Sequence, residues 1–222
     1  MTKKMRFLAV SFIMVSLSQG LLAQVQVSKE PMHRPVFQNK YVRLLDVQVK
    51  KGDTTAFHIH STPSMFVYRS SVTIGTQVKG EKWVEEKTVA GKAWFRSFSP
   101  DSLVHRVCNK DSLPLLVNDI EILSRYDGAP SDVPMPFSIL FENEQAIGYR
   151  VSREDLTGQE FRERGPIVAI LVSGAEVQVH DVPSDEHRIL KPGGFTYINP
   201  ATFFDIKVMG TGPIDLVLFE VR

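Results

Sequence analysis

The chain of 222 residues has one cysteine, almost no net charge and no long amphipathic helical pattern, and these absences exclude several classes of protein. A single cysteine cannot form an intramolecular disulfide. Twenty-six Lys and Arg against 25 Asp and Glu give a net charge of +1, which argues against a nucleic-acid binder that relies on phosphate neutralisation. The sequence also lacks a Gly-rich phosphate loop, a Gly-x-Ser-x-Gly elbow and a Cys-His nucleophile pair.

What the sequence does contain is a globular composition, with 43% apolar and 23% charged residues. Its apolar residues fall in short β-rich runs bounded by Gly, Pro, Asn and Asp, a pattern typical of an all-β protein. In the first half of the chain we predict strands over residues 41–49, 56–59, 65–74, 93–98, 103–107 and 115–123.

The first 23 residues have the order of a secretory signal peptide: Lys3, Lys4 and Arg6, an apolar stretch over 7–22, then Ala23 before the expected cut. Polar residues make the stretch too short and too polar for a comfortable membrane span, although an uncleaved anchor is the alternative. Cleavage would remove three cations and change the net charge from +1 to −2. We therefore expect a soluble periplasmic or secreted protein without a membrane span.

The rest of the chain divides into two similar halves. Residues 125–136 concentrate turn formers and are predicted to link an N-terminal unit, 24–124, to a C-terminal unit, 137–222. Landmarks recur at a spacing of roughly one hundred residues: Gly52 matches Gly158, and Pro100 matches Pro200. Two copies of one small barrel explain this repeat, although turn residues of any β protein could also align in this way.

Three histidines are the chemically most informative residues. His58 and His60 lie two apart on a predicted strand, so both imidazoles point to the same face, and His105 offers a third imidazole from a separate strand. Their setting resembles the two motifs of the cupin family, Gly-x5-His-x-His and Pro-x-Gly-x-x-His-x-x-x-Asn. Here these motifs read Gly52-Asp-Thr-Thr-Ala-Phe-His58-Ile-His60 and Pro100-Asp-Ser-Leu-Val-His105-Arg-Val-Cys-Asn109.

This resemblance, which covers roughly residues 41–123, implies a small jelly-roll barrel with a divalent transition metal (Fe, Mn, Cu, Ni or Zn) held inside by His58, His60 and His105. Together with the repeat, it predicts two tandem barrels. The first motif's usual Glu ligand is absent, because Ser64 or Met65 stands in its place. Asp119 and Glu121 share one strand face, and either could replace that Glu if the face is inward, but charged side chains more often face water.

The second barrel is predicted to lack metal ligands. Arg164 stands where the first His would be, and Asp205 stands where His105 would be. We expect His33, His180 and His187 to be surface residues, and the second barrel to be a packing or dimerising partner that covers exposed edges of the first.

The predicted strand over 93–98, just before the second motif, carries two aromatic side chains, Trp94 and Phe98, with Arg96 between them in the sequence. Facing inward, these side chains could shape a pocket for an aromatic or anionic ligand. Packing of the rings on a partner sheet is the alternative, and Phe66 and Tyr68 offer the same choice.

As to function, the resemblance implies an exported metal-binding cupin, with a metal-dependent dioxygenase of a small organic substrate as the enzyme hypothesis. A non-redox isomerase or hydrolase is less favoured, because the sequence shows no obvious inward carboxylate near His58 and His60 to act as a base. A small-ligand-binding protein without catalysis is the third alternative. A homodimer is compatible with each of these, and no catalytic side chain is assigned.

Overall fold

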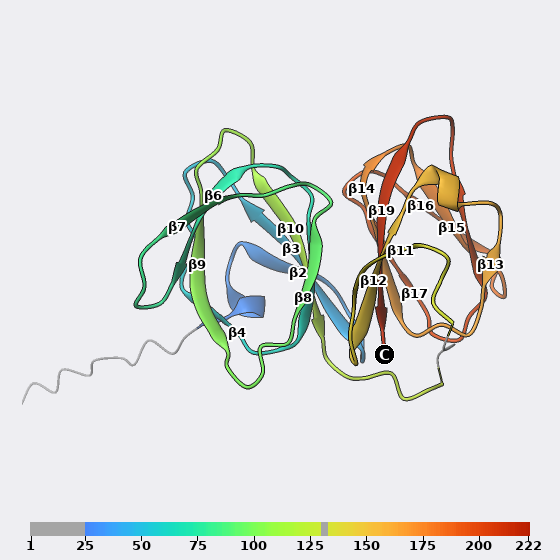
Figure 1. Cartoon of the computed structure of the whole chain (residues 1–222), viewed down its shortest axis with the longest axis horizontal. Helices are drawn as coiled ribbons and strands as arrows, with labels where there is room; N and C mark the ends of the chain where they lie inside the picture. Colours follow the sequence, from blue (N-terminus) through green and yellow to red (C-terminus); the bar gives the residue numbers. More distant parts are fainter. Residues whose placement is uncertain (1–24, 130–132) are drawn as a thin grey trace, which may run out of the picture.

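The computed structural model describes residues 25–129 and 133–222, which form two β-barrels side by side (Figure 1). The predicted signal peptide, residues 1–23, lies outside the described residues. The helices in the described ranges are two short 3-10 turns, η1 (Val27–Lys29) and η2 (Arg153–Asp155). None of the described helices has the length and apolar character to cross a membrane.

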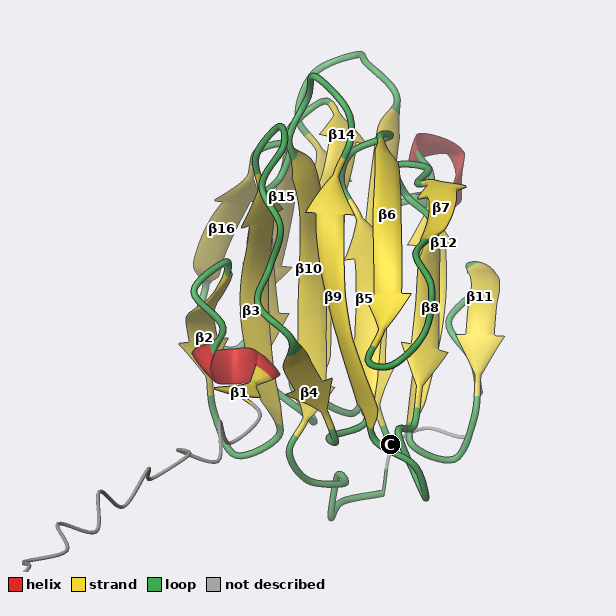
Figure 2. Cartoon of the chain, turned by 90° about the vertical axis from the view of Figure 1, so that its left-hand side faces the viewer, coloured by secondary structure: helices red, strands yellow, loops and turns green. Residues whose placement is uncertain are grey.

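The first barrel consists of two five-stranded sheets. The outer sheet has the order β1 (Val25–Gln26), β4 (His58–His60), β9 (Leu103–Asn109), β6 (Thr73–Val78) and β7 (Val84–Lys87). The inner sheet, nearer the second barrel, has the order β2 (His33–Gln38), β3 (Val42–Val49), β10 (Leu115–Ile122), β5 (Ser64–Tyr68) and β8 (Ala93–Arg96). Figure 2 shows the outer sheet face on, with η1 beside β4.

The second barrel repeats this plan. Its five-stranded sheet has the order β11 (Ser138–Glu142), β12 (Ala146–Val151), β19 (Ile214–Val221), β14 (Ile167–Gly174) and β17 (Phe195–Ile198). Its four-stranded sheet has the order β13 (Glu160–Phe161), β18 (Phe204–Val208), β15 (Val177–Asp181) and β16 (Glu186–Leu190). The predicted repeat extends to the backbone, because Gly52 and Gly158 both have positive φ, +78° and +84°, a conformation that glycine adopts without strain.

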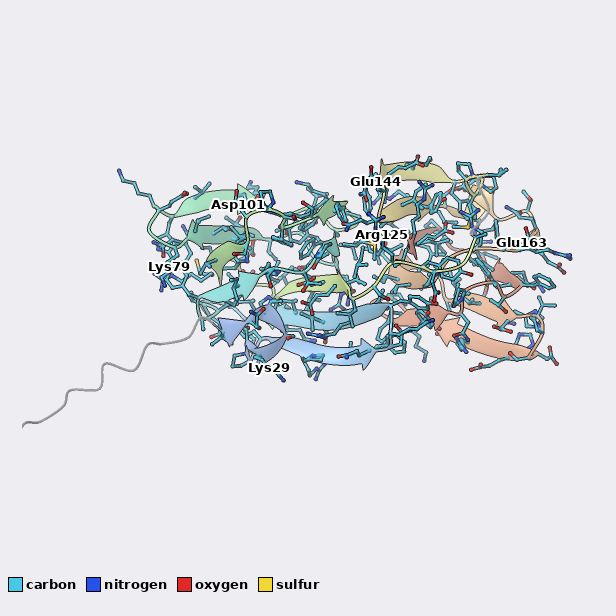
Figure 3. All side chains as sticks on the ribbon, turned by 90° about the horizontal axis from the view of Figure 1, so that it is seen from below. Lys29, Lys79, Asp101, Arg125, Glu144 and Glu163 are labelled. Atoms are coloured by element: carbon cyan, nitrogen blue, oxygen red, sulfur yellow. The ribbon has the colours of Figure 1, made fainter. Side chains whose placement is uncertain are left out.

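The barrels pack face to face through their five-stranded sheets. Met65 and Ile120 of the first barrel share one buried apolar cluster with Val168, Ile170 and Phe219 of the second. The second barrel therefore covers a sheet face of the first, whereas we had expected it to cover sheet edges. At the rim of this junction Arg125 lies 3.7 Å from Glu144, and both are labelled in Figure 3.

Double-sided burial explains the apolar sequences of the central strands. On β14, Ile167, Ala169 and Leu171 face the core of the second barrel, while the alternate residues Val168 and Ile170 face the first barrel. A strand that is buried on both faces reads as a continuous apolar run, because neither side needs polar residues.

The predicted strands recur with shifts of a few residues, apart from one error. Residues 65–74, predicted as one strand, form β5 and β6 instead, with Ser70 and Ser71 between them. The Oγ of Ser70 accepts the N–H of Leu116 at 2.8 Å, and the Oγ of Ser71 accepts the N–H of Ala90 at 2.9 Å. Serine side chains that replace backbone acceptors in this way favour turns over a continuing strand.

Candidate metal centre

The structure brings the rings of His58, His60 and His105 together inside the first barrel. Strands β4 and β9 pair so that His58 lies directly opposite His105, and His60 follows on the same face of β4. The ring centroids are 4.6 Å apart for His58 and His105, 5.0 Å for His60 and His105, and 5.1 Å for His58 and His60. The two motifs thus bring three imidazoles into mutual contact inside the barrel.

Several of these nitrogens are free to bind a cation. The Nδ1 of His58 lies 2.9 Å from the carbonyl oxygen of Ala56, which assigns its proton to Nδ1 and leaves Nε2 as the lone-pair atom. His58 Nε2, His60 Nδ1 and both ring nitrogens of His105 are buried without a hydrogen-bond partner among the described residues. Buried polar atoms are normally paired, so this cluster fits a divalent metal bound by imidazole.

Burial also keeps these rings neutral. Desolvation, followed by the neighbouring His33, lowers the pKa of His58 to about 4. Desolvation, followed by His58, lowers the pKa of His105 to about 3. For His60, desolvation and then His105 and His58 hold the pKa well below its usual value. Neutral imidazole is the form that ligates metals, so the rings need no deprotonation near neutral pH.

The sequence left open whether the strand face of Asp119 and Glu121 is inward, and in the structure this face lines the barrel interior. Asp119 is 1% exposed, and its Oδ2 lies 3.6 Å from Nδ1 of His60. Desolvation and then the nearby Glu121 raise its pKa well above the usual value. Glu121 faces the same interior but lies 3.1 Å from Arg43. The expectation of no inward carboxylate near His58 and His60 is therefore wrong, because β10 turns its polar face into the barrel.

The position of the missing cupin Glu offers no ligand. The Oγ of Ser64 donates to the carbonyl of Thr62 at 3.0 Å, and Met65 points into the apolar cluster between the barrels. Any further protein ligand has to come from another element.

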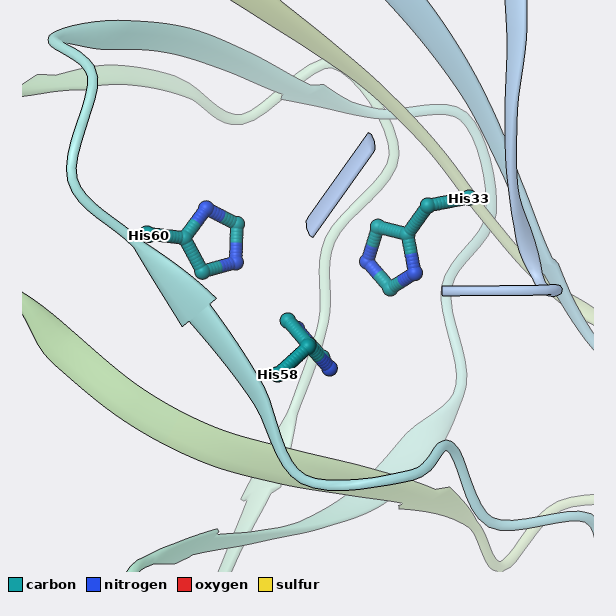
Figure 4. A group of neighbouring side chains, drawn as sticks. All are labelled: His33, His58 and His60. Carbon is teal, nitrogen blue, oxygen red and sulfur yellow. The ribbon is translucent and has the colours of Figure 1, made fainter. Parts of the chain in front are cut away.

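His33 is the site residue that the sequence analysis missed, and the expectation that it lies on the surface is wrong. It is 6% exposed, and its ring centroid lies 4.5 Å from that of His58 and 6.3 Å from that of His60. One ligand atom each of His33, His58 and His60 lie within 4.8 Å of one another. Figure 4 shows His33 reaching this cluster from the side opposite His60.

His33, His60 and His105 lie in the wall of a cavity of about 540 Å³. Rings line much of the wall: Phe66 stacks on Trp94 with centroids 5.0 Å apart and planes 12° apart, and Phe98 stacks on His60 at 5.0 Å. The guanidinium of Arg96 lies 5.0 Å from the centre of Phe98. Of the two alternatives, the inward one is correct, because Trp94, Arg96 and Phe98 all line the cavity, as do Phe66 and Tyr68. The cavity is sized for a small molecule.

The second barrel fills the corresponding space with aromatic rings. Where His58 faces His105, the strand pair β13–β18 places Phe161 opposite Phe204, and both are buried in its core. Arg164 is buried but forms an ion pair with Glu220. Asp205 lies on the outer face of its sheet and contacts His180. The sequence matches of Arg164 and Asp205 to metal ligands are thus off in register, since strand pairing selects the two Phe positions.

A second group of possible ligands lies on the outside of the second barrel. Ligand atoms of His180, Asp185 and His187 lie within 4.8 Å of one another. The two rings stack with centroids 4.2 Å apart, and the side chain of His187 is 46% exposed, in keeping with the predicted surface position. Because of this group, the absence of metal ligands from the second barrel stays a prediction.

Comparison of the sequence with family models and with curated proteins finds no match. Solved structures are similar over most of the chain. AerE from Microcystis aeruginosa is 12% identical, with a TM-score of 0.56 over 87% of this chain and 98% of that one. A cupin 2 conserved barrel domain protein from Leptotrichia buccalis is 10% identical, with a TM-score of 0.54 over 85% and 88%.

A variant of salicylate 1,2-dioxygenase from Pseudoaminobacter salicylatoxidans is 12% identical, with a TM-score of 0.55 over 82% of this chain and 70% of that one. At these identities the similarity concerns the fold alone. The chain has the cupin fold, in two tandem barrels, as the two motifs implied.

Proposed function

We propose that the first barrel binds a divalent transition metal through His58, His60 and His105 and oxidises a small organic substrate with dioxygen. The observation that carries this proposal is the set of buried imidazole nitrogens without protein partners at the wall of a cavity. Iron, manganese, copper or nickel with free coordination positions supplies redox chemistry with dioxygen. The chain itself holds the ligand rings neutral and provides a chamber beside them whose wall is largely aromatic.

The lining of the chamber supports a flat, largely apolar substrate. The stacked pair Phe66 and Trp94 offers a planar surface, and Tyr68 lies 4.8 Å from Trp94, ring to ring. Aromatic faces orient planar molecules by offset or edge-on packing. The guanidinium of Arg96, which also lines the cavity, can pair with an anionic group of the substrate.

Metal analysis of the purified protein tests the proposal. The wild type should contain near-stoichiometric metal, and a His58→Ala, His60→Ala double variant should contain almost none. A His180→Ala, His187→Ala double variant removes the second group of possible ligands, and it should keep the metal if the first barrel holds it. Oxygen-electrode assays of metal-loaded protein with small aromatic acids then measure the oxidation. If the wild type takes up no metal even after reconstitution, the proposal fails.

Asp119 supports a second function, metal-dependent isomerisation or hydrolysis without a redox step. A buried carboxyl with a raised pKa next to a ligand ring can hold or transfer a proton to a substrate in the cavity. Turnover that continues without dioxygen and is lost in Asp119→Asn, with metal content retained, would favour this function. Saturable ligand binding without any turnover would favour the binding protein instead.

Export to the periplasm completes the proposal. It depends on the order of charged and apolar residues over 1–23. The mass of the protein recovered from the periplasm tests it, since cleavage after Ala23 leaves Gln24 at the N-terminus.

A further inference from the structure

The segment 25–33 crosses the first barrel from one sheet to the other. Its start, β1, pairs in parallel with β4, and Val25 lies opposite His58. Its end, β2, pairs with β3, and His33 lies opposite Val47. Between them Val27 is 1% exposed and belongs to the apolar core of the barrel. This path brings the His33 side chain to the same interior as the two motif strands.

We propose that His33 is a fourth ligand of the metal held by His58, His60 and His105, and that Glu30 positions it. The inference rests on the proposed function, because it presupposes a metal in the first barrel. Neither motif of the fold contributes His33, so the ligand set would be particular to the way this chain begins its first barrel.

Glu30 fixes the orientation of the His33 ring. The carboxylate is 3% exposed, and its Oε2 lies 2.7 Å from Nδ1 of His33. The same oxygen accepts the N–H of Met32 at 2.8 Å, and Oε1 accepts the N–H of Ala56 at 3.1 Å. These three N–H groups make the Glu30 carboxylate a hydrogen-bond acceptor. Because it accepts the hydrogen bond of Nδ1–H, the proton of the His33 ring stays on Nδ1 and Nε2 is left as the donor atom for a metal.

The surroundings of His33 leave a cation as the simplest explanation of the cluster. His33 and His105 each lie against the rings of His58 and His60, and in the described part of the chain no hydrogen bond joins any two of these four imidazoles. A packed core would use apolar side chains here, as the second barrel does. A metal ion, by contrast, gives each lone pair a partner and repays the cost of burying polar rings.

The first motif lacks its usual carboxylate ligand, so there is room for another donor. Ser64 and Met65 are turned to other partners. His33 supplies a neutral nitrogen where the usual donor is an anionic oxygen. Four imidazoles on a six-coordinate metal still leave two positions for small molecules.

Cobalt titration of the chelator-treated full-length protein tests this proposal, with calorimetry for affinity and visible absorption for coordination. His33→Gln should weaken Co²⁺ binding by about 100-fold or more, beyond the loss expected for a partner that does not touch the metal, and should change the absorption bands, since a nitrogen bound to the metal is lost. Glu30→Gln should weaken binding by about 10-fold with the bands retained, since a positioning partner is altered. Glu85→Gln, at an exposed carboxylate of β7 that pairs with Lys110, is the control and should bind as the wild type does.

The outcomes separate the two proposals. If the wild type binds no Co²⁺, the proposed function itself fails. If the wild type binds but His33→Gln has the same affinity and the same bands, His33 is not a ligand and the three-histidine site stands. Should the variants not fold, pulsed electron paramagnetic resonance of the Cu²⁺-loaded wild type counts the imidazoles directly. Four bound rings support the proposal, and three overturn it.

Discussion

The two barrels share one topology but use their interiors in opposite ways. On the inner face of β10 the first barrel has Val117 and Asp119, where β19 of the second has Leu216 and Leu218. Beside them, His58 facing His105 corresponds to Phe161 facing Phe204. The exchange of a few inward side chains therefore separates a barrel with a polar cluster and a cavity from a barrel with a filled core.

This difference separates the part of a barrel that stabilises the fold, the junction between the barrels, from the part that can bind a ligand, the interior. The sheet faces that pack against each other at the junction of the barrels carry apolar side chains in both barrels. Among the described residues, the interiors differ in kind at the β4–β9 pair and at Asp119. The second barrel, whose interior is filled, can therefore stabilise the first barrel, whose interior holds a cavity and polar side chains. The apolar cluster that the two barrels share lies outside both interiors.

The largest effect should come from opening the filled barrel. Phe204 is fully buried and packs on Phe161 with centroids 5.2 Å apart, so Phe204→Ala should lower the free energy of unfolding by about 4 kcal/mol. Phe66→Ala in the first barrel should cost less, because part of that ring faces the cavity already. Urea unfolding followed by far-ultraviolet circular dichroism measures both. Equal losses would mean that the two interiors are packed alike.

The next effect concerns the buried ion pair of the second barrel. The side chains of Arg164 and Glu220 are 6% and 1% exposed, so Glu220→Ala should cost about 3 kcal/mol by leaving a buried guanidinium without its partner. Replacing both, by Arg164→Met and Glu220→Leu, should restore most of that loss. Glu121→Ala in the first barrel is the comparison, and it should cost less because its partner Arg43 is 23% exposed. A larger loss for Glu121→Ala would contradict this ranking.

The effect of His105→Leu on the free energy of unfolding should change sign when metal is added, and this change would distinguish the histidine cluster from a packed core. In chelator-treated protein, His105→Leu should raise the free energy of unfolding by about 1 kcal/mol, because it removes two buried nitrogens without partners. In metal-loaded protein the wild type should be the more stable, since a metal bound to the native state stabilises it in proportion to the logarithm of its concentration over the dissociation constant. Thermal melts with and without metal measure the reversal, and a variant that is less stable in both conditions would refute it.

Sequence reasoning reached the fold and the three motif histidines because local rules determine them. Glycine and proline mark the turns, and alternation along β4 places His58 and His60 on one face. The face of Asp119 could not be assigned in this way. Both faces of β10 are buried, one in the cavity and one against the second barrel, so the strand shows no contrast between an apolar and a polar side.

His33 was assigned to the surface because its position depends on contacts distant in the sequence. It precedes the first predicted strand, and only the pairing of β1 with β4 and of β2 with β3 turns the segment across the barrel. The spacing of Glu30 and His33, three residues apart, was the one available signal, since a carboxylate near a histidine is a common partner of a metal ligand.

The smallest effect should come from the histidines of the second barrel. His180 contacts Asp205 on β18 at 2.9 Å and Asp185 in the adjoining turn at 3.1 Å, and His187 on β16 stacks on it. The hydrogen bond to Asp205, with that to Asp185, raises the pKa of His180. A raised pKa means that the stabilisation is fully present below the unfolded value of about 6.5 and is lost as the pH rises through the folded pKa.

His180→Gln should therefore lower the melting temperature more at pH 5.5 than at pH 8, by a small amount because the pair is near the surface. Groups of the first barrel titrate identically in wild type and variant, so their contributions cancel in the difference between the two melting temperatures. Asp205→Asn should remove the same pH dependence of the melting temperature. The double variant with Asp205→Asn and His180→Gln should then differ little from either single variant in this pH dependence. A difference that stays constant with pH would mean that the carboxylates do not hold a protonated His180.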